Sequence, residues 1–498
     1  MHLSTRLDCD LVAVESADEL TLLVELTAPT PASTTIRQPA TLQVVLDRSG
    51  SMDGDRLESA KAALIALVER LDPADNLGVV AFDNQVQIVV PAGPLTNKAA
   101  VKQAIAEVDA GGSTDLSAGY LRGLQEARRV CGPAGATLLL VSDGHANAGV
   151  VDPVALGQVA AEAHTHRITS STVGFGLGYD ERLLAALAQG GAGNELFAEE
   201  ADTAIALISG EVDGLLTQVG QAASLRVRWT PDVASASIVN DLPCTALPDG
   251  FVVELGSFYA GESRRLLIKL QIPGIAALGL AEVAVLELTH VSLPDLVQHT
   301  ATLPVQVNVV PGDQAAGRVR DPQVHSEALF QQSQQAKRRS SRLLSEGRVQ
   351  EASALLHQTS LDLDAWAGSM PDQYAAELTH EAQLMSSLAQ EAEVDSARAA
   401  KVSSYSATMG SRNRGRQSRG GRFQLRWVSG GEALVLDEWE LVRLERMSPP
   451  ARMVRTAVGD HIAPELATII LDGLDTDHPH RDFFAGAVAH DGFSVERA

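Results

Sequence analysis

The stretch VVLDRSGSMDGDRL, residues 44–57, runs from a continuous apolar segment into a turn crowded with oxygen-bearing side chains. Asp47 ends the apolar run, and Ser49 and Ser51 follow it at intervals of two residues. A short uninterrupted apolar run is typical of a strand that is buried on both faces. The stretch therefore predicts a strand that delivers one carboxylate and two hydroxyls to a tight turn.

The sequence around this stretch alternates short apolar runs with amphipathic segments from residue 41 to about 218. The expected strands lie at 41–47, 76–82, 85–90, 137–143, 168–176 and 194–198. The expected helices lie at 56–71, 98–108, 116–130, 152–166, 180–189 and 202–216. This alternation predicts an α/β fold with a doubly wound, mostly parallel sheet covered by helices on both faces. The polar FDNQVQ segment predicts a hairpin, which makes 85–90 an antiparallel edge strand.

Ligands of parallel α/β sheets bind at the carboxyl edge, where strands end and helices begin. Asp47 and Asp143 each end a predicted strand, and GGSTDLS at 111–117 precedes a predicted helix. Five side chains are therefore expected to converge at this edge, namely Asp47, Ser49, Ser51, Thr114 and Asp143. Because all five offer oxygen, a hard divalent cation is indicated rather than zinc. Mg²⁺ is the expected ion because few carboxylates are present, with Ca²⁺ and Mn²⁺ as alternatives.

Three segments resemble the metal-ion-dependent adhesion site of von Willebrand factor type A (VWA) domains: DRSGSM at 47–52, GGSTDLSAG at 111–119 and SDG at 142–144. TVGFGLGYDERLLAALAQGG, further along the chain, also resembles this family. The resemblance covers 41–218 and implies a Rossmann-like fold. It implies that Ser49, Ser51 and Thr114 bind the metal through their hydroxyls, whereas Asp47 and Asp143 act mainly through bound water. It also implies a coordination position left for an Asp or Glu carboxylate of a protein partner.

The flanks of the α/β region are rich in short strands without helices. RLDCDLVAV and ELTLLVELTAP within residues 1–40 predict a hairpin, and 219–312 predicts a β-sandwich. We expect residues 1–40 to join that sandwich, so that the VWA region is an insertion in it. These flanks resemble the intracellular bacterial members of the family, whose layout is related to the inter-alpha-trypsin inhibitor heavy chains. That resemblance also implies that the protein functions together with an AAA+ ATPase.

The last third of the chain predicts a different architecture. Residues 320–408 predict three helices, broken near Gly347 and Pro371, that form a helical hairpin or arm. Residues 409–422 are rich in Arg, Gly and Ser and predict a flexible linker. Residues 423–498 open with strand-like runs and predict a small carboxyl-terminal domain of unassigned fold.

Composition narrows the class of protein. The formal net charge of −24 over 498 residues disfavours binding to nucleic acid or anionic lipid over most of the surface. The three cysteines form no CxxC pair, and neither a signal peptide nor an 18-residue apolar span is recognisable. A cytoplasmic protein without a membrane span is therefore expected.

Several features of the sequence allow more than one interpretation. Asp115 is interpreted as a helix cap and His145 as an exposed loop residue, although His145 is the one candidate base near the site. His478 and His480 form an HxH motif that suits either a second metal site or a solvated loop. The favoured function is non-enzymatic, metal-dependent protein binding. The alternatives are a metal-assisted hydrolase, an activity within 423–498, and nucleic-acid binding through the Arg-rich linker.

Overall fold

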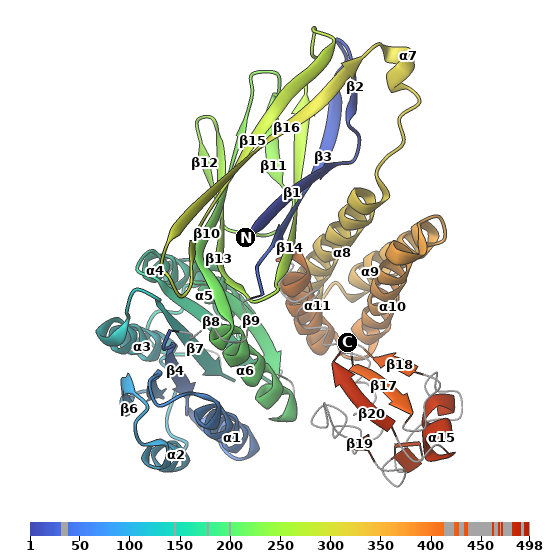
Figure 1. Cartoon of the computed structure of the whole chain (residues 1–498). Coiled ribbons are helices and arrows are strands. Elements are labelled where there is room, and N and C mark those ends of the chain that lie inside the picture. Colours follow the sequence, from blue (N-terminus) through green and yellow to red (C-terminus); the bar gives the residue numbers. More distant parts are fainter. Residues whose placement is uncertain are drawn as a thin grey trace. The chain divides into compact units, whose positions relative to one another are not determined.

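The computed structural model describes most of the chain up to residue 412 and shorter segments beyond it (Figure 1). The described residues are 1–30, 38–143, 146–176, 179–198, 201–412, 423–427, 433–436, 461–462, 467–468, 470–471, 481–489 and 493–497. The chain divides into two compact units, Met1–Asn413 and Arg414–Ala498.

A six-stranded sheet with the order β6-β5-β4-β7-β8-β9 forms the centre of the α/β region. Its strands are β4 (Thr41–Asp47), β5 (Asn76–Phe82), β6 (Val86–Pro94), β7 (Ala136–Ser142), β8 (Ile168–Phe175) and β9 (Ala192–Ala198). Neighbouring strands are parallel except for β6, which pairs antiparallel with β5 at one edge, as predicted. Every residue of β4 is buried, which explains its uninterrupted apolar run.

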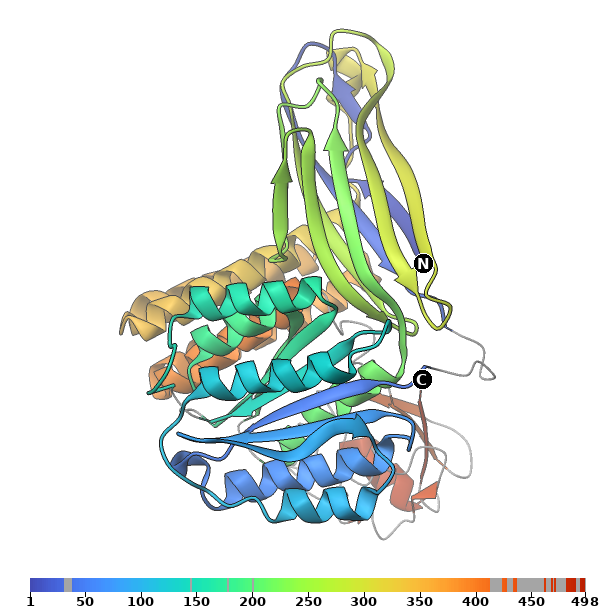
Figure 2. The ribbon, with the colours of Figure 1, turned by 90° about the vertical axis from the view of Figure 1, so that its left-hand side faces the viewer.

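Helices cover both faces of this sheet (Figure 2). They are α1 (Asp55–Arg70), α2 (Lys98–Ala106), α3 (Leu116–Val130), α4 (Pro153–Thr165), α5 (Glu181–Gly190) and α6 (Ala201–Leu216). The buried stripe of α1, with Leu57, Leu64 and Leu67, packs into the same apolar core as the strand residues Leu46 and Val141. The α/β class and the doubly wound, mostly parallel sheet are therefore confirmed.

Two further sheets flank the α/β region in sequence, with the orders β1-β3-β14-β11 and β12-β13-β10-β15-β16-β2. Their strands are β1 (His2–Leu7), β2 (Leu11–Ala13), β3 (Asp18–Thr27), β10 (Gln218–Trp229), β11 (Ser235–Ile238), β12 (Cys244–Leu247), β13 (Gly250–Tyr259), β14 (Ser263–Ile272), β15 (Gly279–Ser292) and β16 (Gln298–Val310). One apolar core joins the two sheets, with Leu22 and Leu266 from the first and Leu225 and Leu286 from the second. Since β3 pairs with β14 and β2 with β16, strands from both ends of the α/β region build the same layers.

The predicted single strand over RLDCDLVAV is wrong. β1 ends at Leu7 and β2 begins at Leu11, and the two strands lie in different sheets. Asp8 lies at the break, where its buried Oδ1 accepts the backbone N–H groups of Cys9 at 2.9 Å and Thr21 at 2.8 Å. These bonds turn the chain out of the first sheet, so only β1 pairs antiparallel with β3.

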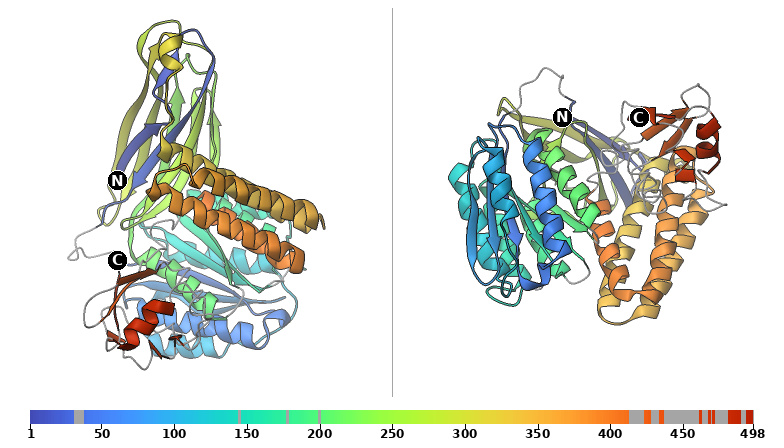
Figure 3. Two further views of the ribbon diagram at one scale, coloured as in Figure 1. Left: turned by 90° about the vertical axis from the view of Figure 1, so that its right-hand side faces the viewer. Right: turned by 90° about the horizontal axis from the view of Figure 1, so that it is seen from below.

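The helical region begins with the short α7 (Gly312–Ala315), which contacts β2. It continues with α8 (Pro322–Ser345), α9 (Val349–Ala367), α10 (Asp372–Val394) and α11 (Ser396–Ser411), and these four helices pack side by side (Figure 3). The breaks near Gly347 and Pro371 lie where predicted. The expected third helix is instead two helices, because the Asp395 side chain accepts the N–H of Arg398 at 3.0 Å and caps a new helix, α11.

The start of the predicted Arg-rich linker is also wrong. Residues up to Ser411 belong to α11, and the buried Arg412 donates through Nη1 to the carbonyl oxygen of Gly193 in β9. A buried arginine with a specific acceptor holds the chain in place, so this part of 409–422 is not a linker. The rest of that segment, His145 and the HxH motif lie outside the described residues.

The second unit contains a sheet of order β18-β17-β20-β19 with antiparallel pairs. Its described elements are β17 (Phe423–Trp427), β18 (Ala433–Leu436), β19 (His461–Ile462), α15 (Arg481–Ala489) and β20 (Phe493–Arg497). Within the described parts of the chain, no helix is long and apolar enough to cross a lipid bilayer.

Candidate metal centre

The carboxyl ends of β4 and β7 lie side by side, because these two strands are neighbours in the sheet and pair Leu46 with Val141. Asp47 is the last residue of β4, and Asp143 follows the last residue of β7. The chain leaves β4 towards β5 on one side and later returns to β7 on the other, so the strand order reverses between them. The two carboxylates thus stand at the switch point that favours ligand binding in open α/β sheets.

Asp47 shapes the turn after β4. Its side chain is fully buried, with Oδ1 accepting the N–H of Ser49 at 2.8 Å and Oδ2 accepting the hydroxyl of Ser142 at 2.5 Å. Burial raises the pKa of Asp47, and the negative charge of Asp143 raises it further, whereas the hydrogen bonds from Ser142 and Ser49 lower it. A cation bound beside Asp47 would offset the burial and stabilise the ionised carboxylate.

The two hydroxyls of the turn connect it to the loop after β7. Ser49 Oγ lies 3.2 Å from Ser51 Oγ, and Ser51 Oγ donates to Asp143 Oδ1 at 2.8 Å. Ser49 is almost completely buried, whereas Ser51 is exposed, so the cluster extends from the interior to the surface. Three predicted ligands therefore form one hydrogen-bonded chain, which we call the Ser49–Asp143 chain.

Thr114 is brought to the site by its loop. Gly50 N–H donates to Gly112 O at 3.0 Å and Gly111 N–H to Arg48 O at 2.6 Å, which holds the loop against the turn. Thr114 itself is 3% exposed, and its N–H donates to Asn147 Oδ1 at 2.9 Å. Among the described residues, no hydrogen bond joins its hydroxyl to the Ser49–Asp143 chain.

Asp115, next to Thr114, caps α3 as predicted. Its Oδ1 accepts the N–H of Ala118 at 2.9 Å and the hydroxyl of Ser117 at 2.7 Å. Both contacts serve the helix start, so Asp115 fixes the direction in which the Thr114 loop enters α3.

The sequence-based prediction missed three contributors. Ser142 orients Asp47, and Asp83 supports the Thr114 loop by accepting the N–H of Gly112 at 3.1 Å. The third is Arg56 in the first turn of α1, whose Nη1 donates to Asp143 Oδ2 and to Ser51 O at 3.2 Å. Its position at the start of the helix that follows the Asp47 turn is a signal that sequence reasoning could have used.

The donor set suits a hard divalent cation. It consists of oxygen atoms only, and it carries two carboxylates against the single guanidinium of Arg56. In the described residues, no group of three or more His, Cys, Asp or Glu side chains is placed to hold a metal. The residues expected to hold a cation are thus mainly hydroxyls, with only Asp47 and Asp143 as carboxylates.

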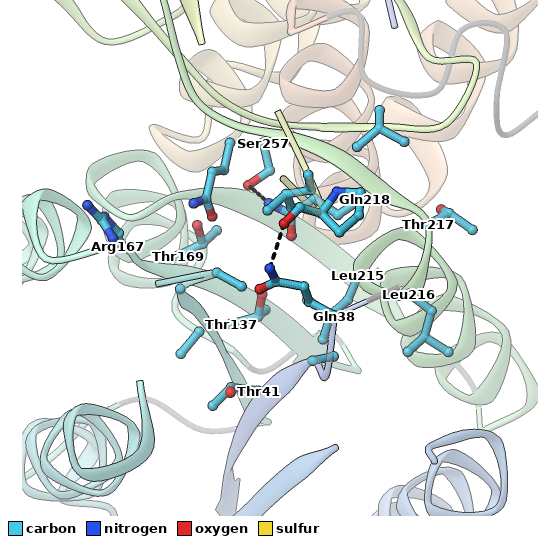
Figure 4. A pocket seen from close by; sticks show the side chains of 18 of the residues that line it. Gln38, Thr41, Thr137, Arg167, Thr169, Leu215, Leu216, Thr217, Gln218 and Ser257 are labelled. Atoms are coloured by element: carbon cyan, nitrogen blue, oxygen red, sulfur yellow. Dashed lines mark hydrogen bonds between the residues drawn. The ribbon is translucent and has the colours of Figure 1, made fainter. Parts of the chain in front are cut away.

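A cavity of about 340 Å³ lies at the opposite, amino edge of the sheet (Figure 4). Thr41, Thr137 and Thr169, at the starts of β4, β7 and β8, form part of its lining. Gln38 reaches across it, donating to Pro294 O at 2.6 Å. This cavity is separate from the candidate metal centre because it faces the other ends of the same strands.

Residues 42–210 match the family model of the von Willebrand factor type A domain. This part of the chain is a VWA domain. Its bounds enclose the whole six-stranded sheet except for the first residue of β4. VWA domains generally mediate protein–protein interactions, and some of them bind divalent metal ions at the site that the Asp47 turn resembles.

Curated relatives match part of the chain. The uncharacterized protein sll0103 of Synechocystis is 35% identical over 170 residues, which cover 34% of this chain and 40% of that protein. The inter-alpha-trypsin inhibitor heavy chain H1 of Mesocricetus auratus is 28% identical over 163 residues, covering 30% of this chain and 18% of that protein. The matched region thus spans less than half the length of either relative.

Solved structures share the fold over more than the VWA domain. The von Willebrand factor type A structure from Catenulispora acidiphila has a TM-score of 0.62 at 16% identity, covering 78% of this chain and 89% of that one. The ArnB paralog VWA2 from Sulfolobus acidocaldarius has a TM-score of 0.55 at 16% identity, covering 82% and 98%. At this identity the likeness concerns the fold alone.

Proposed function

We propose that this chain is a non-enzymatic binding protein whose VWA domain captures a protein partner through a divalent cation, with Mg²⁺ as the first candidate. The cation would be held by Asp47, Ser49, Ser51, Thr114 and Asp143, and a partner Asp or Glu carboxylate would complete its coordination. The Ser49–Asp143 chain carries this proposal, because it links the two hydroxyls of the turn after β4 to the carboxylate of the loop after β7, through contacts of 3.2 Å and 2.8 Å.

Each residue has a distinct part in the proposed site. Asp47 is held by Ser49 and Ser142, so its carboxylate orients the turn without leaving the interior. Ser51 is exposed and marks the side from which a partner reaches the site. When bound, the cation would supply positive charge and an open coordination position for an anionic oxygen. A site with few direct carboxylates leaves that charge incompletely neutralised, which favours capture of a further carboxylate.

Binding is favoured over hydrolysis by the hydrogen bonds of the site. The Ser51 hydroxyl donates to Asp143, and the other oxygen of Asp143 is paired with Arg56. Both oxygens of Asp143 are thus already engaged as hydrogen-bond acceptors, which leaves this carboxylate poorly placed to act as a general base. The metal-assisted hydrolase is therefore the less supported alternative.

Isothermal titration of the full chain with Mg²⁺ tests the proposed site directly. Asp47→Asn and Ser51→Ala should each weaken Mg²⁺ binding at least about tenfold, because the first removes a negative charge beside the cation and the second removes a hydroxyl ligand. Ser117→Ala is the matched control, since this hydroxyl lies in the neighbouring helix start and bonds to Asp115. Unchanged Mg²⁺ affinity in both site variants would contradict the metal site.

A pull-down with and without EDTA tests the partner separately. Proteins retained by the wild type in Mg²⁺ should be lost in EDTA and with Asp47→Asn, and should be released by free acetate at high concentration. If the chain binds Mg²⁺ but retains the same proteins in EDTA, the cation does not bridge the chain to its partner. That result would leave the proposed metal site itself unchallenged.

A further inference from the structure

Four exposed apolar side chains lie together beside the candidate metal centre, and we call them the Val150 patch. They are Leu121 in α3, Val150 and Val151 in the loop after β7, and Val154 in the first turn of α4, and their exposure ranges from 42% for Leu121 to 66% for Val154. Among the described side chains of the VWA domain, the only other large aliphatic or aromatic side chain that is exposed is Val86, on the edge strand β6. Single exposed apolar residues are common on protein surfaces, whereas a group of them marks an interaction site.

Hydrogen bonds hold the Val150 patch against the loop that carries Thr114. The carbonyl oxygen of Thr114 accepts the backbone N–H of Asn147 at 3.1 Å, and Ser117 Oγ accepts the N–H of Val150 at 2.9 Å. Leu121 lies one helical turn beyond Ser117 on the same face of α3, which places it beside Val150. Because Ser117 follows Thr114 by three residues and each residue spans at most about 3.6 Å, the patch begins within about 11 Å of Thr114. The patch therefore adjoins a proposed ligand of the cation.

The loop that carries two of the valines is fixed in place. A Cβ on Gly149 would lie 2.2 Å from Asp115 Oδ1, and the backbone at Gly149 has a φ of 72°, so glycine allows the loop to approach α3 this closely. Asp152 is the one acidic residue within 150–154, and it caps α4 by accepting two backbone N–H groups at 3.3 and 3.1 Å. Since that carboxylate serves the helix start, the patch is preformed and offers mainly methyl groups to a partner.

The other side of the metal centre carries positive charge. Arg56 belongs to α1, which covers the opposite face of the sheet from α3 (Figure 2), and its side chain is partly exposed. A bound cation would add to this positive charge and attract an anionic group. The valines instead favour an apolar group, because burying them removes apolar surface from water. The surface as a whole is therefore complementary to a partner that presents an acidic and an apolar side chain next to each other.

Resting on the proposed cation bridge, we propose that the Val150 patch receives a large aliphatic or aromatic side chain from the same partner segment whose Asp or Glu binds the cation. An extended segment advances about 3.3 Å per residue, so the distance of about 11 Å puts the apolar residue within about four residues of the acidic one. The cation selects the carboxylate and the patch selects its neighbour. The two together define the partner as a short acidic segment with a large apolar residue close by.

Selection of a random peptide library displayed on phage, with the full chain in Mg²⁺ as the target, tests the patch. Enriched peptides should carry an Asp or Glu with a large apolar residue within about four positions. Their affinity, measured by fluorescence polarisation of the synthetic peptides, should fall at least about threefold with Val151→Ser or Val154→Ser and at least about tenfold with both, because apolar contact area is lost. Leu280→Ser is the matched control, since Leu280 is an aliphatic residue of β15 that is 76% exposed.

Calorimetric titration of the same variants with Mg²⁺ separates the patch from the cation bridge. Both serine variants should bind Mg²⁺ as the wild type does and keep its melting temperature, because the valines are exposed and offer no ligand. If the enriched peptides need Mg²⁺ but bind the serine variants and the wild type equally, the cation bridge stands and the patch is rejected. An equal loss with Leu280→Ser would also reject the patch. Peptide binding that survives EDTA would overturn the cation bridge together with the patch.

Discussion

The guanidinium of Arg56 lies against the carboxylate of Asp143, at the edge of the sheet where the divalent cation is proposed to bind. Asp143 is buried, whereas the Arg56 side chain is 46% exposed. A positive charge that belongs to the chain therefore stands beside a carboxylate that a cation would also use. Arg56 should compete electrostatically with the cation while remaining free to turn towards solvent or towards a partner carboxylate.

Replacing Arg56 should strengthen cation binding. Arg56→Met removes one positive charge near the site, and Mg²⁺ affinity should rise about 3- to 10-fold at low salt, because like charges a few ångströms apart repel even when partly solvated. Titration calorimetry at two ionic strengths measures the effect, which should shrink as salt increases.

Arg122→Met is the matched control for Arg56→Met. Arg122 is 39% exposed and pairs with the buried Glu126, so it repeats the same kind of ion pair away from the site. If Arg56→Met instead weakens Mg²⁺ binding, Arg56 serves to position Asp143 and the competition model fails.

Two variants of Thr114 distinguish a direct contact between its hydroxyl and the cation from a role in shaping the loop. Thr114→Val keeps the volume of the buried side chain but removes its oxygen, and should lower Mg²⁺ affinity at least about tenfold. Thr114→Ser restores the hydroxyl and should recover most of the affinity. Equal loss in both variants, at unchanged melting temperature, would mean that Thr114 supports the loop without contacting the cation.

Glu195 on β9 makes stability depend on pH. Burial raises the pKa of Glu195 to about 7, although the charges of Arg412 and Lys401 oppose the shift. The folded chain therefore holds a proton that the unfolded chain releases, and the free energy of unfolding should fall as pH rises from about 4.5 to 7. Urea unfolding across this range should show a contribution of up to about 3 kcal/mol.

Glu195→Gln isolates that contribution, because the amide resembles the protonated carboxyl group. The variant should match the wild type near pH 5 and be more stable near pH 8. The same difference between variant and wild type at both pH values would rule out Glu195 as the source. The charged groups that act on Glu195 are Arg412, Glu181 and Lys401. All three should be kept unchanged in the comparison.

Lys401 ties α11 to the VWA domain. Its Nζ donates to Tyr179 O at 2.7 Å and Glu181 Oε2 at 2.8 Å, and lies 4.0 Å from the Tyr179 ring centroid. Lys401→Met should destabilise this contact by about 2 kcal/mol, since it leaves the carbonyl of the buried Tyr179 and the partly buried Glu181 carboxylate without their partner. Hydrogen exchange should speed up in α11 and β9. Lys269→Met, which breaks an exposed pair with Glu19, should change stability by less than about 1 kcal/mol.

Local patterns in the sequence determined much of this protein. The apolar run that ends at Asp47, the stripe of α1 and the cap at Asp115 each depend on residues a few positions apart, so periodicity and turn chemistry predict them. The oxygen-only ligand set is likewise a property of the residue types. The same reasoning failed at Asp8 and Asp395, where single side-chain hydrogen bonds end one element and start another.

Only the tertiary structure decided which distant residues meet. The order of the strands makes Asp47 and Asp143 neighbours, and the loop after β7 brings Val150 onto Ser117. The packing of α11 on β9 buries Glu195 beside Arg412, and the path of α1 places Arg56 on Asp143. These contacts follow from how the chain crosses between layers, which is set by the burial of whole apolar faces and leaves no local signal at the residues that meet.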